Sequence, residues 1–83
     1  SWRDMFVSVV KLIYEIAPVT INRLADNSDY LYLVKTPSTG YVNISDSVYL
    51  YKNNSTMSKI NTLKRIFDEC GIQEESLLFE VFL

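Results

Sequence analysis

Histidine is missing from this chain, and only one of its 83 residues, Cys70, is a cysteine. Without histidine the chain has no imidazole for a catalytic triad, a general acid–base pair or a metal ligand. A single cysteine excludes an internal disulfide and a zinc site built from several cysteines, and it fits a reducing compartment. We therefore expect a chain that is not an enzyme and that holds no cofactor or metal.

An excess of positive charge is also missing. Eight lysines and arginines stand against ten aspartates and glutamates, which gives a net charge of −2 and a pI of about 4.9. Bulk attraction to nucleic acid requires a surplus of positive charge, so such binding would have to come from a local basic patch. No apolar run approaches the roughly 20 residues that cross a bilayer, and no signal peptide is visible. We expect a cytoplasmic protein that does not contact membranes.

Length and composition indicate one small globular domain. With 48% hydrophobic and 22% charged residues, the chain has the composition of a folded protein. Its 83 residues allow a single core, so we expect residues 1–83 to form one domain. The chain starts with Ser1 instead of Met, and we expect it to be excised from a larger protein.

Hydrophobic spacing predicts two helices at the start of the chain. In residues 2–16, apolar residues recur every three or four positions, on a stripe wide enough that two sides of the helix should be covered. Ser1 and Asp4 have the spacing of a capping box. Pro18 ends this helix and suits the first position of a second helix over residues 18–26. The residues expected to face the core are Trp2, Met5, Phe6, Val9, Val10, Leu12, Ile13 and Ile16, followed by Val19, Ile21, Leu24 and Ala25.

Strand-like segments occupy the middle of the chain. Residues 30–35, 41–44 and 48–52 are rich in aromatic, aliphatic and β-branched side chains and are separated by turn residues, which predicts a three-stranded meander.

A third helix and a fourth strand follow. Gly71 suits the end of a helix over residues 56–70, closed by a Schellman motif with Ile72. A final strand is expected over residues 77–82. The order ααβββαβ predicts an α+β fold with a small mixed β-sheet, since a right-handed β-α-β crossover makes its two strands parallel. The helices should pack mainly on one face, and the third helix should bury Met57, Ile60, Leu63, Ile66, Phe67 and Cys70.

Tyrosine is abundant, with six residues, and four of them lie in two predicted strands. Because side chains alternate along a strand, Tyr30, Tyr32, Tyr49 and Tyr51 should gather on one open face of the sheet. Tyrosine is enriched in protein interfaces, which favours an interaction face. Two alternatives stay open: ordinary packing of tyrosines across strands, and stacking of nucleic-acid bases.

A local basic patch is the second candidate site. The start of the third helix combines cap residues with lysines that suit an anion, and its polar face carries further positive charge. Ordinary helix capping and a solvated polar face explain the same residues. The candidate residues for anion or nucleic-acid contact are Lys52, Asn54, Ser55, Lys59, Lys64 and Arg65.

The order of elements resembles a known class of small domain. A Ser-Trp-x-Asp-Met helix start, a Tyr-Leu-Tyr strand and the run Val-Tyr-Leu-Tyr-Lys-Asn-Asn-Ser-Thr before a Lys-rich helix carry the resemblance. They are similar to small, uncharacterised C-terminal accessory domains of bacterial restriction-like and phage-defence proteins. The resemblance covers most of the chain and implies an accessory or targeting module attached to an effector. Its motifs are caps, strands and core positions, so it transfers no functional residue.

Together these observations predict a non-catalytic protein-interaction or oligomerisation module of a larger intracellular, bacterial protein. Its partners would be other domains of the parent protein or a second copy in a homodimer. The alternative is a nucleic-acid-binding module that uses the basic patch on the third helix.

Overall fold

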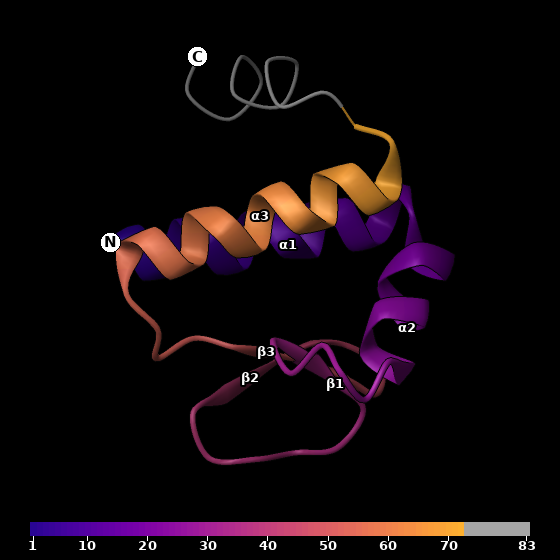
Figure 1. Ribbon diagram of the computed structural model, residues 1–83. Coiled ribbons are helices and arrows are strands. Elements are labelled where there is room, and N and C mark those ends of the chain that lie inside the picture. Colours follow the sequence, from indigo (N-terminus) through magenta and orange to yellow (C-terminus); the bar gives the residue numbers. More distant parts are fainter. Residues whose placement is uncertain (73–83) are drawn as a thin grey trace.

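The computed structural model describes residues 1–72 and confirms an α+β fold (Figure 1). Its elements in chain order are α1 (Trp2–Ile16), α2 (Pro18–Asp26), β1 (Leu33–Val34), β2 (Tyr41–Ser45), β3 (Val48–Tyr51) and α3 (Thr56–Cys70). Within residues 1–72 all strand pairs are antiparallel. The predicted strand 77–82, and with it the β-α-β unit and the mixed sheet, lies outside the described residues.

The helices begin and end where the sequence predicts. At the start of α1, the Ser1 hydroxyl accepts a hydrogen bond from the Asp4 amide at 3.2 Å, and the Asp4 carboxylate lies 3.7 Å from the Ser1 ammonium. At the end of α3, Gly71 is left-handed, with φ of 69°, and the Ile72 amide donates to the Phe67 carbonyl at 2.9 Å. This 6→1 bond and the Gly71 amide bond at 3.2 Å complete a Schellman motif.

The sheet is not a meander, because β3 lies between β1 and β2. Leu50 of β3 pairs with Leu33 on one side and with Val42 on the other. A tight turn at Asp46, which has a positive φ of 46°, joins β2 to β3 as a hairpin. The longer connection over residues 35–40 then carries the chain from β1 to the far edge of the sheet, so the predicted strand order was wrong.

The first strand is shorter than predicted. Asn27 accepts the Asp29 amide on its side-chain oxygen at 3.0 Å and the Tyr30 amide on its carbonyl at 3.0 Å. This turn continues through Leu31 and Tyr32, so regular pairing begins only at Leu33. The strict alternation expected over residues 30–35 is therefore wrong: Tyr30 is buried and Leu31 is 64% exposed.

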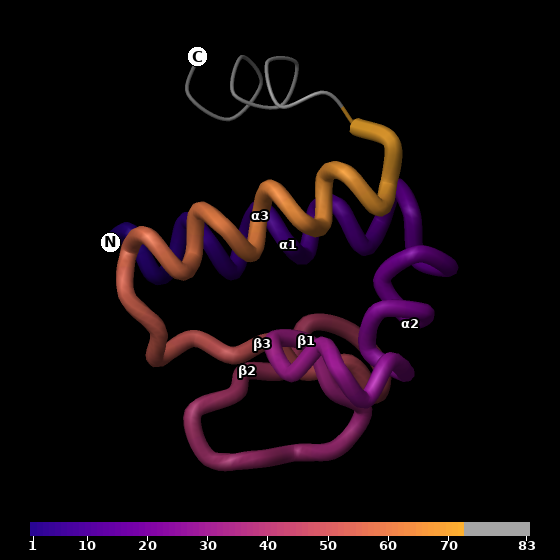
Figure 2. The backbone as a smooth tube through the Cα atoms, in the orientation of Figure 1, coloured from indigo at the N-terminus to yellow at the C-terminus, as the bar shows by residue number. Residues whose placement is uncertain are grey.

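The core lies between the helices and the sheet. Figures 1 and 2 show α1 and α3 side by side above the sheet, while α2 stands at its end. This arrangement does not confirm packing of all helices on one face, since α2 contacts β1 from the end of the sheet. The largest fully buried side chains are Phe6, Ile13, Ile21, Leu33, Leu50, Ile66, Val10 and Val48.

Several predicted core residues face outward instead. Leu12, Ile16, Val19 and Met57 are exposed, and Cys70 is half-buried. The buried stripe of α3 includes the polar residues Lys59 and Thr62. Burial of both is tolerated because Thr62 donates to the Ser58 carbonyl at 2.8 Å and Lys59 donates to the Asn54 carbonyl.

The two glycines give a matched test of the loop geometry. At Gly71 an added Cβ would meet no atom of residues 1–72 within 4 Å, so Gly71→Ala should cost only the left-handed strain, about 1 kcal/mol. At Gly40, with φ of 85°, a Cβ would lie 3.0 Å from Asn53 and 3.1 Å from Tyr51. Gly40→Ala should therefore lower the free energy of unfolding by about 2 to 3 kcal/mol. Urea denaturation measures both variants, and equal losses would contradict this geometry.

Candidate functional site

Four tyrosine rings form a continuous row across one end of the sheet. Tyr30 and Tyr32 have ring centroids 5.6 Å apart, Tyr32 and Tyr51 6.4 Å, and Tyr41 and Tyr51 5.1 Å. The rings are tilted by 59°, 52° and 51°, which is a favourable arrangement for aromatic pairs. We call these four residues the tyrosine row.

The tyrosine row differs from the predicted face in one of its four members. Tyr49 belongs to none of the ring pairs among residues 1–72, and it lies opposite Val34 and Asn43. Tyr41 takes its place, because the register of β2 and β3 sets it directly opposite Tyr51. Its hydroxyl donates to the Leu31 carbonyl at 2.7 Å, which ties β2 to the turn before β1.

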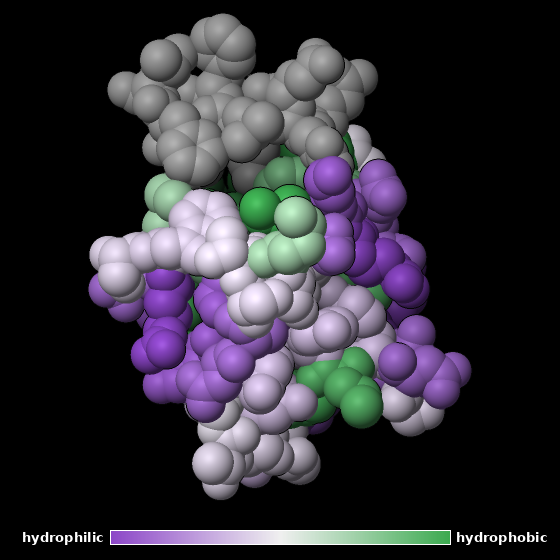
Figure 3. Space-filling view, turned by 60° about the vertical axis from the view of Figure 1, so that its left-hand side comes forward, coloured by the Kyte–Doolittle hydropathy of each residue, from purple (hydrophilic) through white to green (hydrophobic). Residues whose placement is uncertain are grey.

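Exposure varies along the row. Tyr30 is only 8% exposed and belongs to the core, so it does not lie on an open face. Tyr32 is 38% exposed, and Tyr41 and Tyr51 are half-buried. Figure 3 shows one face of the molecule, on which apolar side chains form small separate areas among polar ones. The accessible part of the row is therefore a set of half-packed, amphipathic rings.

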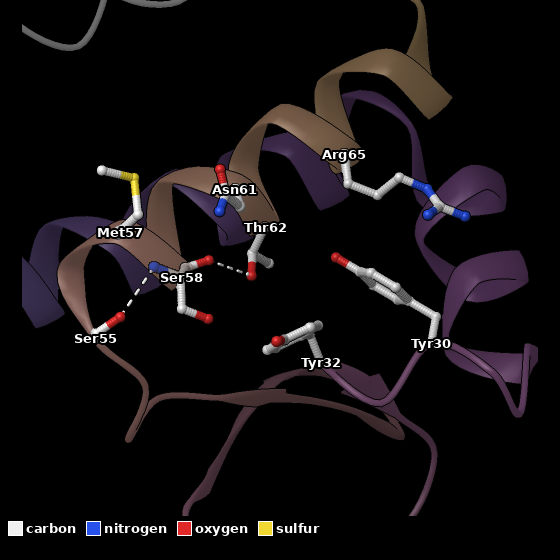
Figure 4. A pocket seen from close by; sticks show the side chains of 8 residues that line it. All are labelled: Tyr30, Tyr32, Ser55, Met57, Ser58, Asn61, Thr62 and Arg65. Carbon is white, nitrogen blue, oxygen red and sulfur yellow. Dashed lines mark hydrogen bonds between the residues drawn. The ribbon is translucent and has the colours of Figure 1, made fainter.

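A groove lies between the buried end of the row and the first half of α3 (Figure 4). Its volume is about 480 Å³. In the close-up, the Tyr30 hydroxyl points from below toward α3, with Arg65 above it and Tyr32 beside it. The described residues that line the groove are Tyr30, Tyr32, Ser55, Met57, Ser58, Asn61, Thr62 and Arg65.

The Tyr30 hydroxyl is buried without a hydrogen-bond partner among residues 1–72. Burial raises the pKa of Tyr30 to about 12, and the neighbouring Tyr32 adds to the rise. Arg65 acts in the opposite direction, because its positive charge stabilises the phenolate. The phenol is therefore neutral at physiological pH and keeps its proton.

Arg65 supplies the positive charge at the groove. Its guanidinium carbon lies 5.3 Å from the centroid of the Tyr30 ring, within the range of a cation–π contact. Its Nε donates to the Glu69 carboxylate at 3.1 Å, one helical turn further along α3. The guanidinium is thus held on the ring by Tyr30 and oriented by Glu69.

The other members of the predicted basic patch do not converge on one point. The Ser55 hydroxyl accepts the Ser58 amide at 3.1 Å as an ordinary N-cap. Lys59 is buried, and its ammonium lies 5.7 Å from the centroid of the Phe6 ring. Burial lowers the pKa of Lys59, and the positive charge of Arg3 lowers it further.

Of the six residues predicted for anion contact, Ser55 and Arg65 line the groove. Asn54 donates from its side chain to the Ser58 hydroxyl at 3.1 Å, and its carbonyl accepts from Lys59. Lys64 is exposed and Lys52 is half-buried. The sequence analysis missed four lining residues, although their spacing places them on one side of a helix: Met57, Ser58, Asn61 and Thr62.

No known protein family, curated protein or solved structure matches this chain. In the described part of the chain, no helix is both long and apolar enough to cross a membrane. Over the same residues, no group of three cysteine or acidic side chains is placed to hold a metal ion.

Proposed function

We propose that the domain is a non-catalytic protein-interaction module that binds through the accessible part of the tyrosine row. The observation that supports this is the set of three ring contacts that links Tyr30, Tyr32, Tyr51 and Tyr41. Leu31 and Met57 extend the surface, since both are about two-thirds exposed, at 64% and 65%.

Pre-ordered rings are well suited to binding a protein. An interface side chain that is mobile before binding loses about 0.5 to 1.5 kcal/mol when it becomes fixed. The row reduces that loss, because each ring already packs against the next and Tyr41 is held by its bond to Leu31. Tyrosine also has both an apolar ring and a hydroxyl, so the surface can form hydrogen bonds with water when no partner is bound.

The partner we propose is a second copy of this chain. In an isologous contact the same surface meets itself across a two-fold axis, so one row of tilted rings can pack against its equivalent. The resemblance to accessory domains of restriction-like and phage-defence proteins supports placing the module in a larger bacterial, cytoplasmic protein. Other domains of that protein are the alternative partner.

Nucleic-acid binding through the third helix has weaker support. Lys64 is exposed and Arg65 lies at the groove, but Lys59 is turned into the core and Arg65 is paired with Glu69. Phosphate contacts predict association that weakens steeply as salt rises, whereas aromatic burial does not. Salt dependence therefore separates the two functions.

Light scattering over a concentration series, at low and moderate salt, tests self-association. We expect a dimer that survives salt, and Tyr32→Ser should weaken it by at least about tenfold, the effect of losing a central aromatic contact. Tyr49→Ser is the matched control, since Tyr49 lies on the same sheet outside the row and its loss should leave the dimer intact. A monomer at every concentration, or equal weakening by both variants, would contradict the proposed partner.

A further inference from the structure

We propose that the groove between Tyr32 and α3 binds a small ligand that joins an anionic oxygen group, a carboxylate or a phosphate, to a planar apolar body. The site is formed within one chain, but it shares Tyr32 and Met57 with the surface proposed for self-association, so the titration is run at the lowest workable protein concentration. Three features carry the proposal: a buried hydroxyl without a partner in residues 1–72, a guanidinium stacked on the ring that bears it, and an apolar wall of the right size.

The hydroxyl of Tyr30 supplies the first feature. The residue is more than nine-tenths buried, its hydroxyl has no hydrogen-bond partner within residues 1–72, and Figure 4 shows it aimed into the groove. Large majorities of buried polar atoms are satisfied in folded proteins, so an exception at a groove indicates a missing partner. A neutral phenol donates its proton, and the missing partner is therefore an acceptor.

Arg65 indicates that the acceptor is negatively charged. Because its Nε is the nitrogen bound to Glu69, its two terminal nitrogens keep their donors, and no other bond from this guanidinium is made to the described residues. Charge-assisted bonds from arginine to carboxylate or phosphate are about twice as strong as neutral ones. Glu69 balances part of the positive charge, which predicts modest affinity and excludes a tight site for a free ion.

The remaining lining indicates what the anionic group is attached to. Tyr32 and Met57 present a ring face and a thioether, which contact planar and apolar groups well. The volume of about 480 Å³ lies inside the roughly 300 to 1,000 Å³ that small-molecule sites occupy. Asn61 and Thr62 add a few polar atoms that can fix the orientation of the ligand.

Titration of the intact 83-residue chain by NMR tests the site and identifies the source of the anion. Adenosine monophosphate is the phosphate probe and indole-3-acetate is the carboxylate probe. Adenosine and inorganic phosphate carry the two halves of the ligand separately. We expect one of the first two probes to bind at millimolar concentration or better, with shifts at Tyr32 and Asn61, and each separate half to bind at least about tenfold more weakly.

Two variants and a control show whether the named groups do the binding. Arg65→Gln and Tyr30→Phe should each reduce affinity about tenfold. Lys64→Gln removes one positive charge from the same helix, outside the groove, and should leave affinity unchanged. Equal losses in Arg65→Gln and Lys64→Gln, adenosine binding as tightly as its monophosphate, or no binding of either complete probe would overturn the proposal. A monomeric chain that still binds a probe would count against the proposed function alone.

Discussion

Phe6→Ala should remove a large part of the stability of the protein at room temperature. Phe6 is fully buried at the centre of the core, and truncation of a buried phenylalanine costs about 3 to 5 kcal/mol in lost burial and cavity formation. A domain of this length is stabilised by only roughly 4 to 12 kcal/mol in total. The loss also removes the ring beneath the Lys59 ammonium, which lies 5.7 Å from its centroid. Among residues 1–72, that charge then keeps the Asn54 carbonyl as its one hydrogen-bond acceptor.

Two controls separate the packing effect from a change in helix propensity. Leu12→Ala makes a truncation on the same helix at an exposed position and should change the free energy of unfolding by less than about 0.5 kcal/mol. Phe6→Leu keeps an apolar side chain in the core and should preserve most of the stability that Phe6→Ala loses. Circular dichroism during urea denaturation measures all three variants. Retention of near wild-type stability by Phe6→Ala would contradict the position of this ring at the centre of the core.

The helices could be predicted because their signals are local. Ser1, Pro18, Ser55 and Gly71 each act within one turn of chain, and each caps or starts a helix where expected. The exposed faces were harder to predict. The buried stripe of α3 was predicted from its apolar residues alone. The structure also buries Thr62 and Lys59, whose polar atoms donate hydrogen bonds to backbone carbonyls.

The sheet could be predicted only in part, because strand order depends on contacts between distant residues. Nothing near Leu33 in sequence specifies that its partner is Leu50 instead of a residue of β2. The predicted length of β1 was wrong for a local reason. The turn that starts at Asn27 extends through Tyr32 and competes with strand pairing.

In the candidate site, too, local features could be predicted and contacts between distant residues could not. Strand periodicity predicted Tyr32 and Tyr51 on one face of the sheet, and in the structure their ring centroids lie 6.4 Å apart. Tyr41 was missed because its place opposite Tyr51 follows from the β2–β3 register. The groove was missed because it joins a turn to a helix more than twenty residues away, and only the folded chain brings Arg65 onto Tyr30.

Tyr30→Phe should make the protein more stable at pH 7 while it weakens ligand binding. The hydroxyl is buried with no partner in the described chain, so its removal relieves a desolvation penalty of about 1 kcal/mol or more. Tyr32→Phe is the matched control, because it removes an exposed hydroxyl and should change stability by less than about 0.5 kcal/mol. A functional group that lowers stability is typical of binding sites, where a polar atom gains its hydrogen-bond partner only when the ligand binds.

The alkaline limb of the stability curve gives a second, independent signature of the same hydroxyl. The folded-state pKa of Tyr30 is raised from 10.0 to about 12, so above pH 10 the unfolded chain loses this proton first. Stability from this group is complete below pH 10 and is lost as pH rises toward 12, by on the order of 2 kcal/mol. Tyr30→Phe should lack that loss, which urea denaturation at pH 7, 10 and 11 measures against wild type. If the variant is instead less stable at pH 7, the hydroxyl is satisfied within the fold. If it keeps the alkaline slope, that slope belongs to other tyrosines and the Tyr30 hydroxyl is not buried. Either result removes the unpartnered donor from which the ligand was inferred.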